Sequence, residues 1–221
     1  MASASGDRVE LRAASLDHPA MNHRCAPADD APDDSQLVEA ARGGDRTAFG
    51  RLYDRYARMV HGILLARVPV SEVDDLVHDV FLLALPRLHA LRDITRFGAW
   101  LAAITRNRAN DYHRHAVDEV ELPEGLSGDQ VESKAADSSG DAEAAFLLAA
   151  IRGLPETYRE TLLLRLVEGM TGPEIAARTG LKHGSVRVNL HRGMQQLREK
   201  LARVGRGAAR CWRRHLSRLR W

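Results

Sequence analysis

Apolar side chains recur every three or four residues along most of the chain, which is the spacing of one face of an α-helix. The clearest stripe consists of Val186, Leu190, Met194, Leu197 and Leu201, at steps of four, four, three and four residues. No stretch shows a convincing alternation of apolar and polar residues, the pattern of a half-buried strand. The chain is therefore predicted to be all-α.

Four helices are predicted in the first half of the chain. The first begins at Ser35 and stops at Gly43, because serine caps helix N-termini and glycine ends helices. The second starts at Thr47 and carries an apolar stripe of four turns, which Pro69 closes. The third opens at Ser71, and its first turns are rich in acids, which the helix dipole favours. The side chains expected to be buried on the second and third helices are Phe49, Leu52, Tyr53, Tyr56, Met59, Val60, Ile63, Leu64, Val73, Leu76, Val77, Val80 and Phe81.

The fourth helix follows a loop over residues 89–96 and keeps its apolar spacing from Phe97 to Tyr112. Its polar surface is crowded with arginine and asparagine, which grip phosphates or read base edges, and exposed aromatic rings stack on unpaired bases. Two interpretations of this helix remain open: a core helix with a solvated polar side, or a surface for single-stranded nucleic acid. Trp100 fits either a core position or a base-stacking position.

A second group of helices is predicted over residues 142–201. One helix ends at Pro155, which also suits the first turn of the next helix. Thr171 then stands three residues before Glu174, the spacing of a capping box, and Gly180 marks the end of that short helix. The long helix with the clearest apolar stripe follows.

These last two helices have the form of a helix-turn-helix, whose second helix enters the major groove of DNA. From residue 171 to residue 201, six basic residues stand against two acidic ones, a local charge of +4 that suits a position beside phosphate. The alternative is a pair of amphipathic helices in an ordinary bundle with a solvated basic face. The motif alone leaves both interpretations open.

Length and composition narrow the class of protein. A chain of 221 residues with 44% hydrophobic content suits one or two small domains. No apolar run is long enough to predict a membrane span, and the N-terminus lacks the pattern of a secretory signal. Cys25 and Cys211 are far apart and predict neither a disulfide framework nor a zinc site, so we expect no metal and no cofactor. A reducing cytoplasm fits this composition.

Three segments differ in composition from the helical parts. Residues 1–34 lack apolar periodicity, which predicts a disordered extension. Residues 117–143 hold nine acids against one lysine and are interrupted by glycine, serine and proline, so we place a flexible acidic linker at residues 117–141. Residues 202–221 hold seven arginines and no acid. This basic tail is either solvated or binds DNA, an acidic regulator or an anionic membrane surface.

Together these segments resemble the extracytoplasmic-function group of bacterial RNA polymerase sigma factors. The segment EVDDLVHDVFLLAL looks like the family's contact with the polymerase clamp, and FGAWLAAITRNRANDYHRH looks like the segment that melts and reads the −10 promoter element. LPETYRETLLLRLVEGMTGPEIAARTG and the helix from Val186 look like the module that reads the −35 element. Because the three occur in the family's order, the resemblance implies two small helical domains, residues 35–116 and residues 142–201.

The resemblance also implies three sets of site residues. The contact with core polymerase is expected at Asp74, Asp75, His78 and Asp79. Contacts with the melted −10 element are expected at Arg92, Arg96, Phe97, Trp100, Arg106, Asn107, Asn110 and Arg114. Contacts with the −35 element are expected at Lys182, Ser185, Arg187, Val188, Asn189, His191 and Arg192.

The function that follows is that of a dissociable transcription-initiation factor, whose partners are core RNA polymerase, through its clamp and flap, and promoter DNA. An anti-sigma factor is left open as a further partner. No enzymatic activity is expected, because the sequence shows no nucleotide-binding loop, no paired catalytic carboxylates and no nucleophile–base spacing. Two alternatives are a helix-turn-helix activator whose N-terminal domain senses a signal, and a protein-interaction adaptor that does not bind DNA.

Three residues depart from the family's pattern or from good helix chemistry. Lys182 stands where the family often has serine or threonine, and the loss of that cap costs about 1 kcal/mol unless Ser185 compensates. Gly193 lies inside the recognition helix, at a cost of up to about 1 kcal/mol relative to alanine. Pro86 is expected to shorten the third helix.

Overall fold

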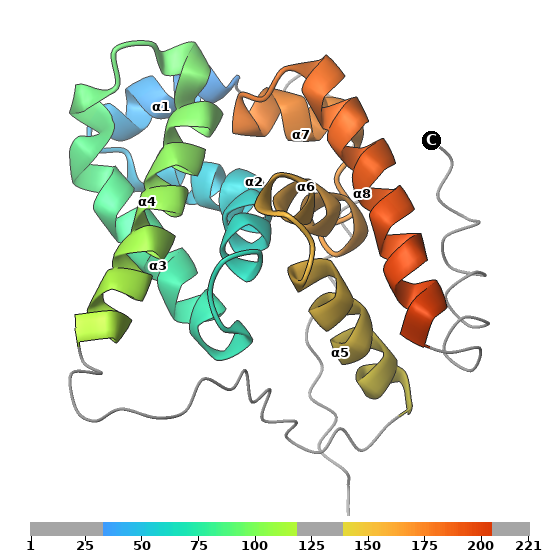
Figure 1. Cartoon of the computed structure of the whole chain (residues 1–221). Helices are drawn as coiled ribbons and strands as arrows, with labels where there is room; N and C mark the ends of the chain where they lie inside the picture. The colour runs from blue at the N-terminus through green and yellow to red at the C-terminus, as the bar shows by residue number, and fades with distance from the viewer. Residues whose placement is uncertain (1–32, 119–138, 205–221) are drawn as a thin grey trace, which may run out of the picture. The chain divides into compact units, whose positions relative to one another are not determined.

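The structure is a computed structural model that describes residues 33–118 and 139–204 (Figure 1). Over these residues all regular structure is helical, which confirms the predicted fold class. The α-helices are α1 (Asp34–Arg42), α2 (Arg46–Leu65), α3 (Val73–Ala84), α4 (Phe97–Asp118), α5 (Ser139–Arg152), α6 (Glu156–Leu166), α7 (Gly172–Thr179) and α8 (His183–Val204). Three short 3-10 helices join them: η1 (Val70–Glu72), η2 (Leu85–Ala90) and η3 (Ile94–Arg96).

The first two helices begin at aspartates, and the predicted caps Ser35 and Thr47 are wrong. Asp33 forms a capping box at the start of α1, and the Asp45 carboxylate accepts the backbone N–H of Thr47 at 2.8 Å. A carboxylate both accepts these hydrogen bonds and interacts favourably with the positive end of the helix dipole. It therefore caps the helix in preference to the nearby hydroxyl, which lies inside the first turn.

Helices α1 to α4, here called the first bundle, pack around α2 (Figure 1). The core side of α2 follows the predicted stripe, and Leu52, Met59 and Ile63 have no exposed surface. The third predicted helix is divided: η1 precedes α3, and α3 ends at Ala84, where Pro86 enters the 3-10 turn of η2. The proline shortens the helix as expected, because its ring and missing N–H do not fit a helix interior.

Helices α5 to α8, here called the second bundle, are held by the stripe of α8. Its five predicted residues, Val186 to Leu201, are all buried, and α8 lies along α5 and α6 (Figure 1). The predicted capping box of α7 is present: the Thr171 N–H donates to Glu174 Oε2 at 2.7 Å, and the Glu174 N–H donates to Thr171 Oγ1 at 3.3 Å. Gly180 ends α7 with φ of 73°, a left-handed conformation that favours glycine.

Gly193 has a packing reason that the sequence did not show. A Cβ at this position would lie 3.0 Å from Tyr158 Cβ and 3.0 Å from Leu162 Cδ1, both on α6. The glycine therefore allows α8 to approach α6 closely, and this close packing offsets its cost in helix propensity.

The two bundles touch each other, since α2 and α4 of the first contact α6 and α7 of the second. Residues 1–32 of the predicted N-terminal extension, both cysteines, most of the acidic linker and most of the basic tail lie outside the described residues. Residues 33 and 34 were wrongly assigned to the disordered extension, since Asp33 caps α1 and Asp34 is its first residue. At the linker's edges, α4 runs to Asp118 and α5 starts at Ser139. In the described part of the chain, no helix has the length and apolar character needed to cross a membrane.

Candidate nucleic-acid interface

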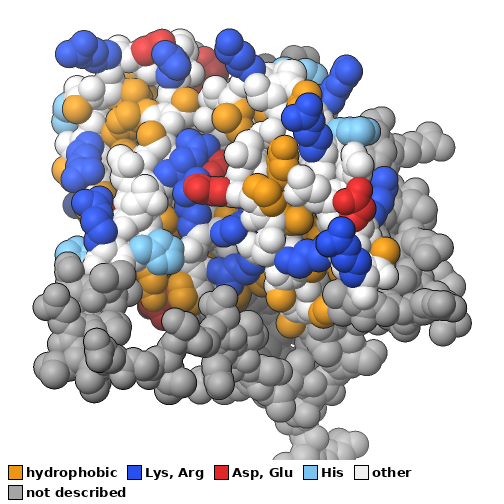
Figure 2. All heavy atoms as spheres, viewed as in Figure 1, with side chains coloured by type: hydrophobic (Ala, Val, Ile, Leu, Met, Phe, Trp, Pro, Cys, Tyr) orange, Lys and Arg blue, Asp and Glu red, His pale blue; other side chains and the backbone are white. Residues whose placement is uncertain are grey.

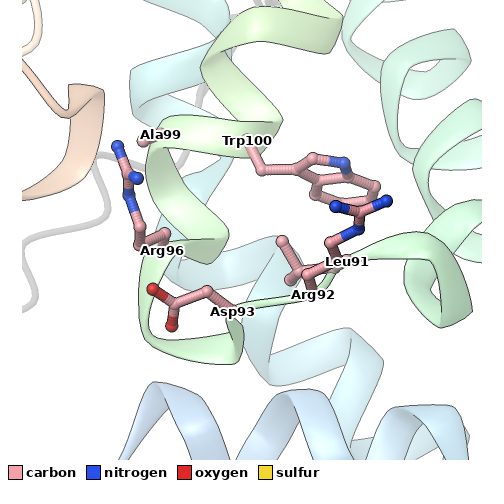
Figure 3. A pocket seen from close by; sticks show the side chains of 6 residues that line it. All are labelled: Leu91, Arg92, Asp93, Arg96, Ala99 and Trp100. Atoms are coloured by element: carbon pink, nitrogen blue, oxygen red, sulfur yellow. The ribbon is translucent and has the colours of Figure 1, made fainter.

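Trp100 lies at a surface pocket beside the start of α4. The pocket has a volume of about 300 Å³ and is lined by Leu91, Arg92, Asp93, Arg96, Ala99 and Trp100. Figure 3 shows the indole reaching from α4 toward the Leu91–Arg92 segment, with Arg96 and Asp93 on the other side of the turn. Trp100 is half-buried, so one part of the ring packs on the core and another part is accessible. The core interpretation of Trp100 therefore holds for part of the ring, and stacking on a base stays a prediction.

The geometry around this pocket suits an unpaired base. The aromatic ring offers a stacking face, and the exposed guanidinium groups of Arg92 and Arg96 lie where they can meet phosphates. The loop is shaped locally by Asp93, whose carboxylate accepts the backbone N–H of Thr95 at 3.1 Å and caps η3. This cap fixes the turn from which Arg96 projects.

Phe97 was expected to contact DNA, and the structure corrects this. Its side chain has no exposed surface, and its ring meets that of Tyr56 edge-on at 5.0 Å between centroids. It lies on the apolar stripe that continues with Leu101 and Ile104, both of which are buried. Phe97 is therefore a core residue that supports Trp100, whose ring centroid lies 5.8 Å away.

The other α4 residues divide into two sets. Asn107, Asn110 and Arg114 are exposed, and Arg114 pairs with Asp111 at 2.5 Å. Arg106 is half-buried and binds Glu160 of α6 with two nitrogens, Nη2 to Oε1 at 2.6 Å and Nε to Oε2 at 3.2 Å. The expected −10 residues from Phe97 to Arg114 are thus on α4, Arg92 and Arg96 precede it, and Arg106 is engaged by the second bundle.

Helix α8 presents the expected −35 residues near its N-terminus. Arg187, Val188, His191 and Arg192 are all exposed, and the exposed fraction of Val188 is 44%. Asn189 is half-buried at the edge of this face and lines a cleft together with Arg106. An exposed aliphatic side chain between cations suits the major groove, where it can meet a thymine methyl group.

Two further expected −35 residues, Lys182 and Ser185, are exposed at the start of α8. The Val186 N–H donates to the Lys182 carbonyl oxygen at 3.0 Å, which closes the first turn. Lys182 therefore stands at the cap position, as the sequence implied, and its ammonium group cannot accept a backbone hydrogen bond. It remains available for a phosphate.

Lys and Arg side chains outnumber Asp and Glu on the face of the molecule shown in Figure 2, viewed as in Figure 1. This face includes α4 and α8, the two helices that carry the expected DNA contacts. A surface of this sign attracts the phosphate backbone whatever its sequence.

The acidic third helix carries a different kind of surface. Asp74, Asp75 and His78 are exposed on α3, whereas the Asp79 carboxylate accepts from Arg108 Nη2 of α4 at 2.8 Å. This ion pair accounts for an acid that lies too far from the helix start for the dipole to explain. Leu82 follows, with 68% of its surface exposed. The sequence analysis did not predict this exposure. The spacing of the chain could have shown it, because Leu82 lies off the apolar stripe of Leu76, Val77, Val80 and Phe81.

Glu160 is the principal residue that sequence reasoning missed. Its side chain is 8% exposed and meets Arg67 as well as Arg106, with Arg67 Nη2 at 3.1 Å from Oε2. Burial raises the pKa of Glu160, but the hydrogen bonds and charges of Arg106 and Arg67 outweigh this and hold the pKa below its usual range. Glu160 is thus a buried carboxylate that stays ionised between two arginines.

No group of three or more His, Cys, Asp or Glu side chains able to hold a metal ion occurs among residues 33–118 and 139–204. Two surface pockets of this part of the chain bring arginines together with acids: Arg92, Arg96 and Asp93 line one, and Arg67, Arg106, Glu156 and Glu160 line the other.

Comparison with known proteins covers both bundles. Residues 52–117 match the family described as Sigma-70 region 2, and residues 147–197 match Sigma-70, region 4. The first match spans most of α2, α3 and α4, and the second spans the helix-turn-helix of α7 and α8.

Two curated relatives and one solved structure are similar over most of the chain. The ECF RNA polymerase sigma factor BldN of Streptomyces coelicolor is 34% identical over 73% of this chain and 63% of its own length. The RNA polymerase sigma factor CarQ of Myxococcus xanthus is 34% identical over 78% of this chain and 100% of its own length. The structure of CnrH in complex with the cytosolic domain of CnrY has a TM-score of 0.55 and 26% identity, over 78% of this chain and 99% of that one.

Proposed function

Because the chain belongs to the extracytoplasmic-function family of RNA polymerase sigma factors, we propose that it binds core RNA polymerase and directs transcription initiation at specific promoters. The observation that supports this best is the pairing of two different DNA-reading surfaces in one chain. One is the Trp100 pocket on α4, suited to an unpaired base, and the other is the exposed face of α8, suited to duplex. The protein is not itself an enzyme in this proposal, since the polymerase carries out the synthesis of RNA.

At the −10 element, the first bundle holds the opened strand. A base that leaves the stack lies against the Trp100 indole, and Arg92 and Arg96 hold the adjacent phosphates. Asn107 and Asn110, exposed on the following turns of α4, read base edges through their amides. The energy of stacking and phosphate contact in this way stabilises the melted state over the duplex.

At the −35 element, α8 enters the major groove. Arg187 and Arg192 bind guanine edges or phosphates, and Val188 contacts a thymine methyl group. His191 donates to a base or a phosphate. Lys182 and Ser185 bind the backbone at the end of the helix, where the N-terminal dipole also favours phosphate.

The proposed protein contacts lie on α3 and on the second bundle. The exposed acids Asp74 and Asp75, with His78 and the exposed Leu82, form a surface for the polymerase clamp, and the second bundle meets the flap. Asp79 contributes less directly, because it is paired with Arg108. The protein acts where the polymerase is, in the cytoplasm. CnrH was solved with the cytosolic domain of CnrY, which supports a protein regulator as a further partner here.

The domain boundaries of this proposal are those of the sequence. Residues 35–116 form the −10 and polymerase-binding domain, residues 142–201 form the −35 domain, and residues 117–141 join them. The matches to residues 52–117 and 147–197 fall inside or within one residue of the two domains.

One experiment tests the function directly. The purified chain is added to core RNA polymerase with a library of promoter fragments, and the 5′ ends of the transcripts are mapped. The expected result is a defined set of start sites that share two short sequence elements at a fixed spacing. Transcripts that begin at the same places with and without the chain would contradict the proposal.

A further inference from the structure

The exposed face of α8 extends beyond the residues expected to contact the −35 element. Arg198 follows Arg187 by eleven residues, and Arg203 follows Arg192 by eleven residues. Eleven residues are about three turns of an α-helix, so each later arginine lies on the same side of α8 as the earlier one. All four side chains are exposed. The cationic face of α8 therefore continues from its first turns almost to Val204, where the helix ends (Figure 1).

A surface groove connects the two parts of this face. It has a volume of about 410 Å³ and is lined by His191, Met194, Gln195 and Arg198. Steps of three and four residues join these positions, which places them along one side of the helix. His191 is one of the expected −35 contacts, whereas Arg198 has no role in that set. The groove thus leads from the −35 residues to an arginine whose partner is still to be found.

The later arginines of α8 have no acidic partner among the described residues. Glu199 is the acid in the sequence of α8, and it accepts from Gln195 Nε2 at 3.2 Å. The ion pairs of residues 33–118 and 139–204 include neither Arg198 nor Arg203. On α4, by contrast, three arginines are paired with carboxylates. The charges of the α8 arginines are therefore open to an anionic partner.

The remainder of the basic tail has the same chemistry. Residues 205–221 lie outside the described residues, and their sequence holds six arginines, no lysine and no acid. A guanidinium group presents paired N–H groups that fit a phosphate, whereas the ammonium group of lysine acts as a point charge. The tail also follows directly on a helix that is expected to meet duplex DNA. Of the partners that the sequence left open, this continuity favours DNA.

The position of Arg198 and Arg203 decides which part of the DNA they meet. Eleven residues of helix measure roughly 16 Å along the axis, at about 1.5 Å per residue. The major groove is about 12 Å wide. When Arg187 and Arg192 lie in the groove, the later arginines are therefore beyond its width, beside the phosphates that border it. Contacts of that kind position a protein on DNA and carry no sequence information directly.

We propose that Arg198, Arg203 and the other arginines of the basic tail form a second DNA contact, which binds the phosphate backbone beside the −35 element without reading its sequence. This inference rests on the proposed function and extends it. Each arginine that neutralises a phosphate releases a counterion, so the contact adds an affinity that depends on salt. The first turns of α8 choose the site, and the later arginines strengthen the binding at whichever site is chosen.

The test removes charge from each part of the contact in the full chain. The helix pair, Arg198→Gln with Arg203→Gln, takes two charges from α8. The tail pair, Arg213→Gln with Arg214→Gln, takes two charges from the rest of the tail. Glutamine is about as good a helix former as arginine, so neither change weakens a helix. Circular dichroism checks that the helix content of both variants is that of the unsubstituted chain.

A control pair separates the effect of a site from the effect of net charge. Arg46→Gln with Arg51→Gln also removes two charges, from exposed side chains of α2 in the first bundle. Neither residue belongs to a proposed contact with DNA or polymerase. A general attraction between a basic protein and DNA would respond to the control pair as much as to the other two.

The measurement is the salt dependence of DNA binding without polymerase. A labelled random-sequence duplex of about 30 base pairs is titrated by fluorescence anisotropy at a series of salt concentrations. Each phosphate contact contributes roughly 0.9 to the slope of log affinity against log salt concentration, so the helix pair and the tail pair should each lower the slope by roughly one to two units. The control pair should leave the slope unchanged. With core polymerase, both pairs should keep the start sites and need more factor for the same yield.

The outcomes separate this inference from the proposed function. If the helix pair or the tail pair keeps the slope of the unsubstituted chain, the contact as proposed is overturned, even where the start sites are normal. An equal fall of the slope in the control pair overturns it as well. A tail pair that keeps the slope but no longer binds vesicles of phosphatidylcholine and phosphatidylglycerol in equal amounts would assign the tail to a membrane surface instead. If the unsubstituted chain fails to direct transcription with core polymerase, the proposed function fails, whatever the slopes show.

Discussion

Helices α4 and α8 both carry the cations expected to meet DNA, and the structure presents them in different ways. On α8, Arg187, His191 and Arg192 are exposed together with Val188 on one face. On α4, Arg106 and Arg108 are half-buried in ion pairs with Glu160 and Asp79, whereas Asn107, Asn110 and Arg114 are exposed. The face of α8 is available in the free chain, whereas that of α4 is partly occupied.

The difference fits the two forms of DNA that we propose for these helices. Duplex DNA exists before the polymerase arrives, so a helix that reads the major groove can be exposed at all times. Unpaired DNA exists only in the opened promoter, and an exposed surface of arginine and tryptophan would bind single strands elsewhere. In this structure Glu160 of the second bundle binds Arg106 of α4. The comparison therefore separates residues that support a surface from residues that form it.

The largest effect is expected when a supporting residue is removed. Phe97→Ala should lower the free energy of unfolding by about 3–5 kcal/mol. The Phe97 side chain is fully buried and packs against Tyr56, so its removal leaves a cavity in the core. Urea unfolding followed by circular dichroism measures this. Trp100→Ala serves as the control, since Trp100 is only half-buried and its loss should cost clearly less stability. Equal losses in the two variants would mean that Phe97 and Trp100 do not divide the roles as proposed.

The sequence predicted the framework well and the contacts between bundles poorly. The stripe of α8 and the capping box of Thr171 and Glu174 are local patterns, which depend on residues within one or two turns. Glu160 could not be predicted, because its partners Arg67 and Arg106 are 93 and 54 residues away in the chain. Its neighbours Thr161 to Leu164 are all buried, which indicates in retrospect a helix enclosed on more than one side.

The misplacement of Phe97 has a different cause. Its spacing to Leu101 and Ile104 placed it on the apolar stripe of α4, but the family resemblance marked the whole segment as a DNA contact. Periodicity was the better guide at this residue, because a helix that binds DNA on one face must still bury the other. The caps at Ser35 and Thr47 failed because a stronger acceptor, aspartate, stood nearby in each case.

The second prediction concerns the surface of α4 itself. Trp100→Ala should weaken binding to the opened −10 strand by roughly 1–3 kcal/mol, the value of one base stacked on an aromatic ring. Permanganate reactivity of the promoter bubble measures opening, and Trp100→Phe should retain part of it because a stacking face remains. Closed-complex binding should change little. Normal bubble reactivity in a folded Trp100→Ala variant would remove this residue from the melting surface.

The third prediction concerns the exposed face of α8. An arginine that reads a base should cost roughly 1–3 kcal/mol when replaced and relax specificity at one position of the −35 element. An arginine that holds a phosphate should weaken all sequences alike and lower the salt slope by about one unit. Binding of Arg187→Ala and Arg192→Ala to a set of −35 duplexes at two salt concentrations distinguishes these roles. Should both variants bind every duplex as tightly as the unsubstituted chain, α8 does not read DNA.

The smallest effect is expected from the pH dependence of the contact between His61 of the first bundle and Glu168 of the second. The hydrogen bond from His61 to Glu168 raises the pKa of His61, and burial opposes this without cancelling it. Glu168 also faces Arg58, and the charge of Asp74 raises the pKa of His61 to a smaller extent. Protonated His61 therefore stabilises the contact between the two bundles.

The sign of the dependence follows from the raised pKa. The contribution of His61 is fully present below its ordinary pKa of about 6.5 and is lost as the pH rises through the raised value. The contribution of this pair to the free energy of unfolding, measured with urea, should therefore fall modestly from about pH 6 to about pH 8. The effect is small because the His61 side chain is 35% exposed and solvent screens the pair. His61→Gln, which keeps a polar side chain without the titration, should make the slope of the unfolding free energy against pH smaller. The same slope in this variant would assign the dependence to other groups.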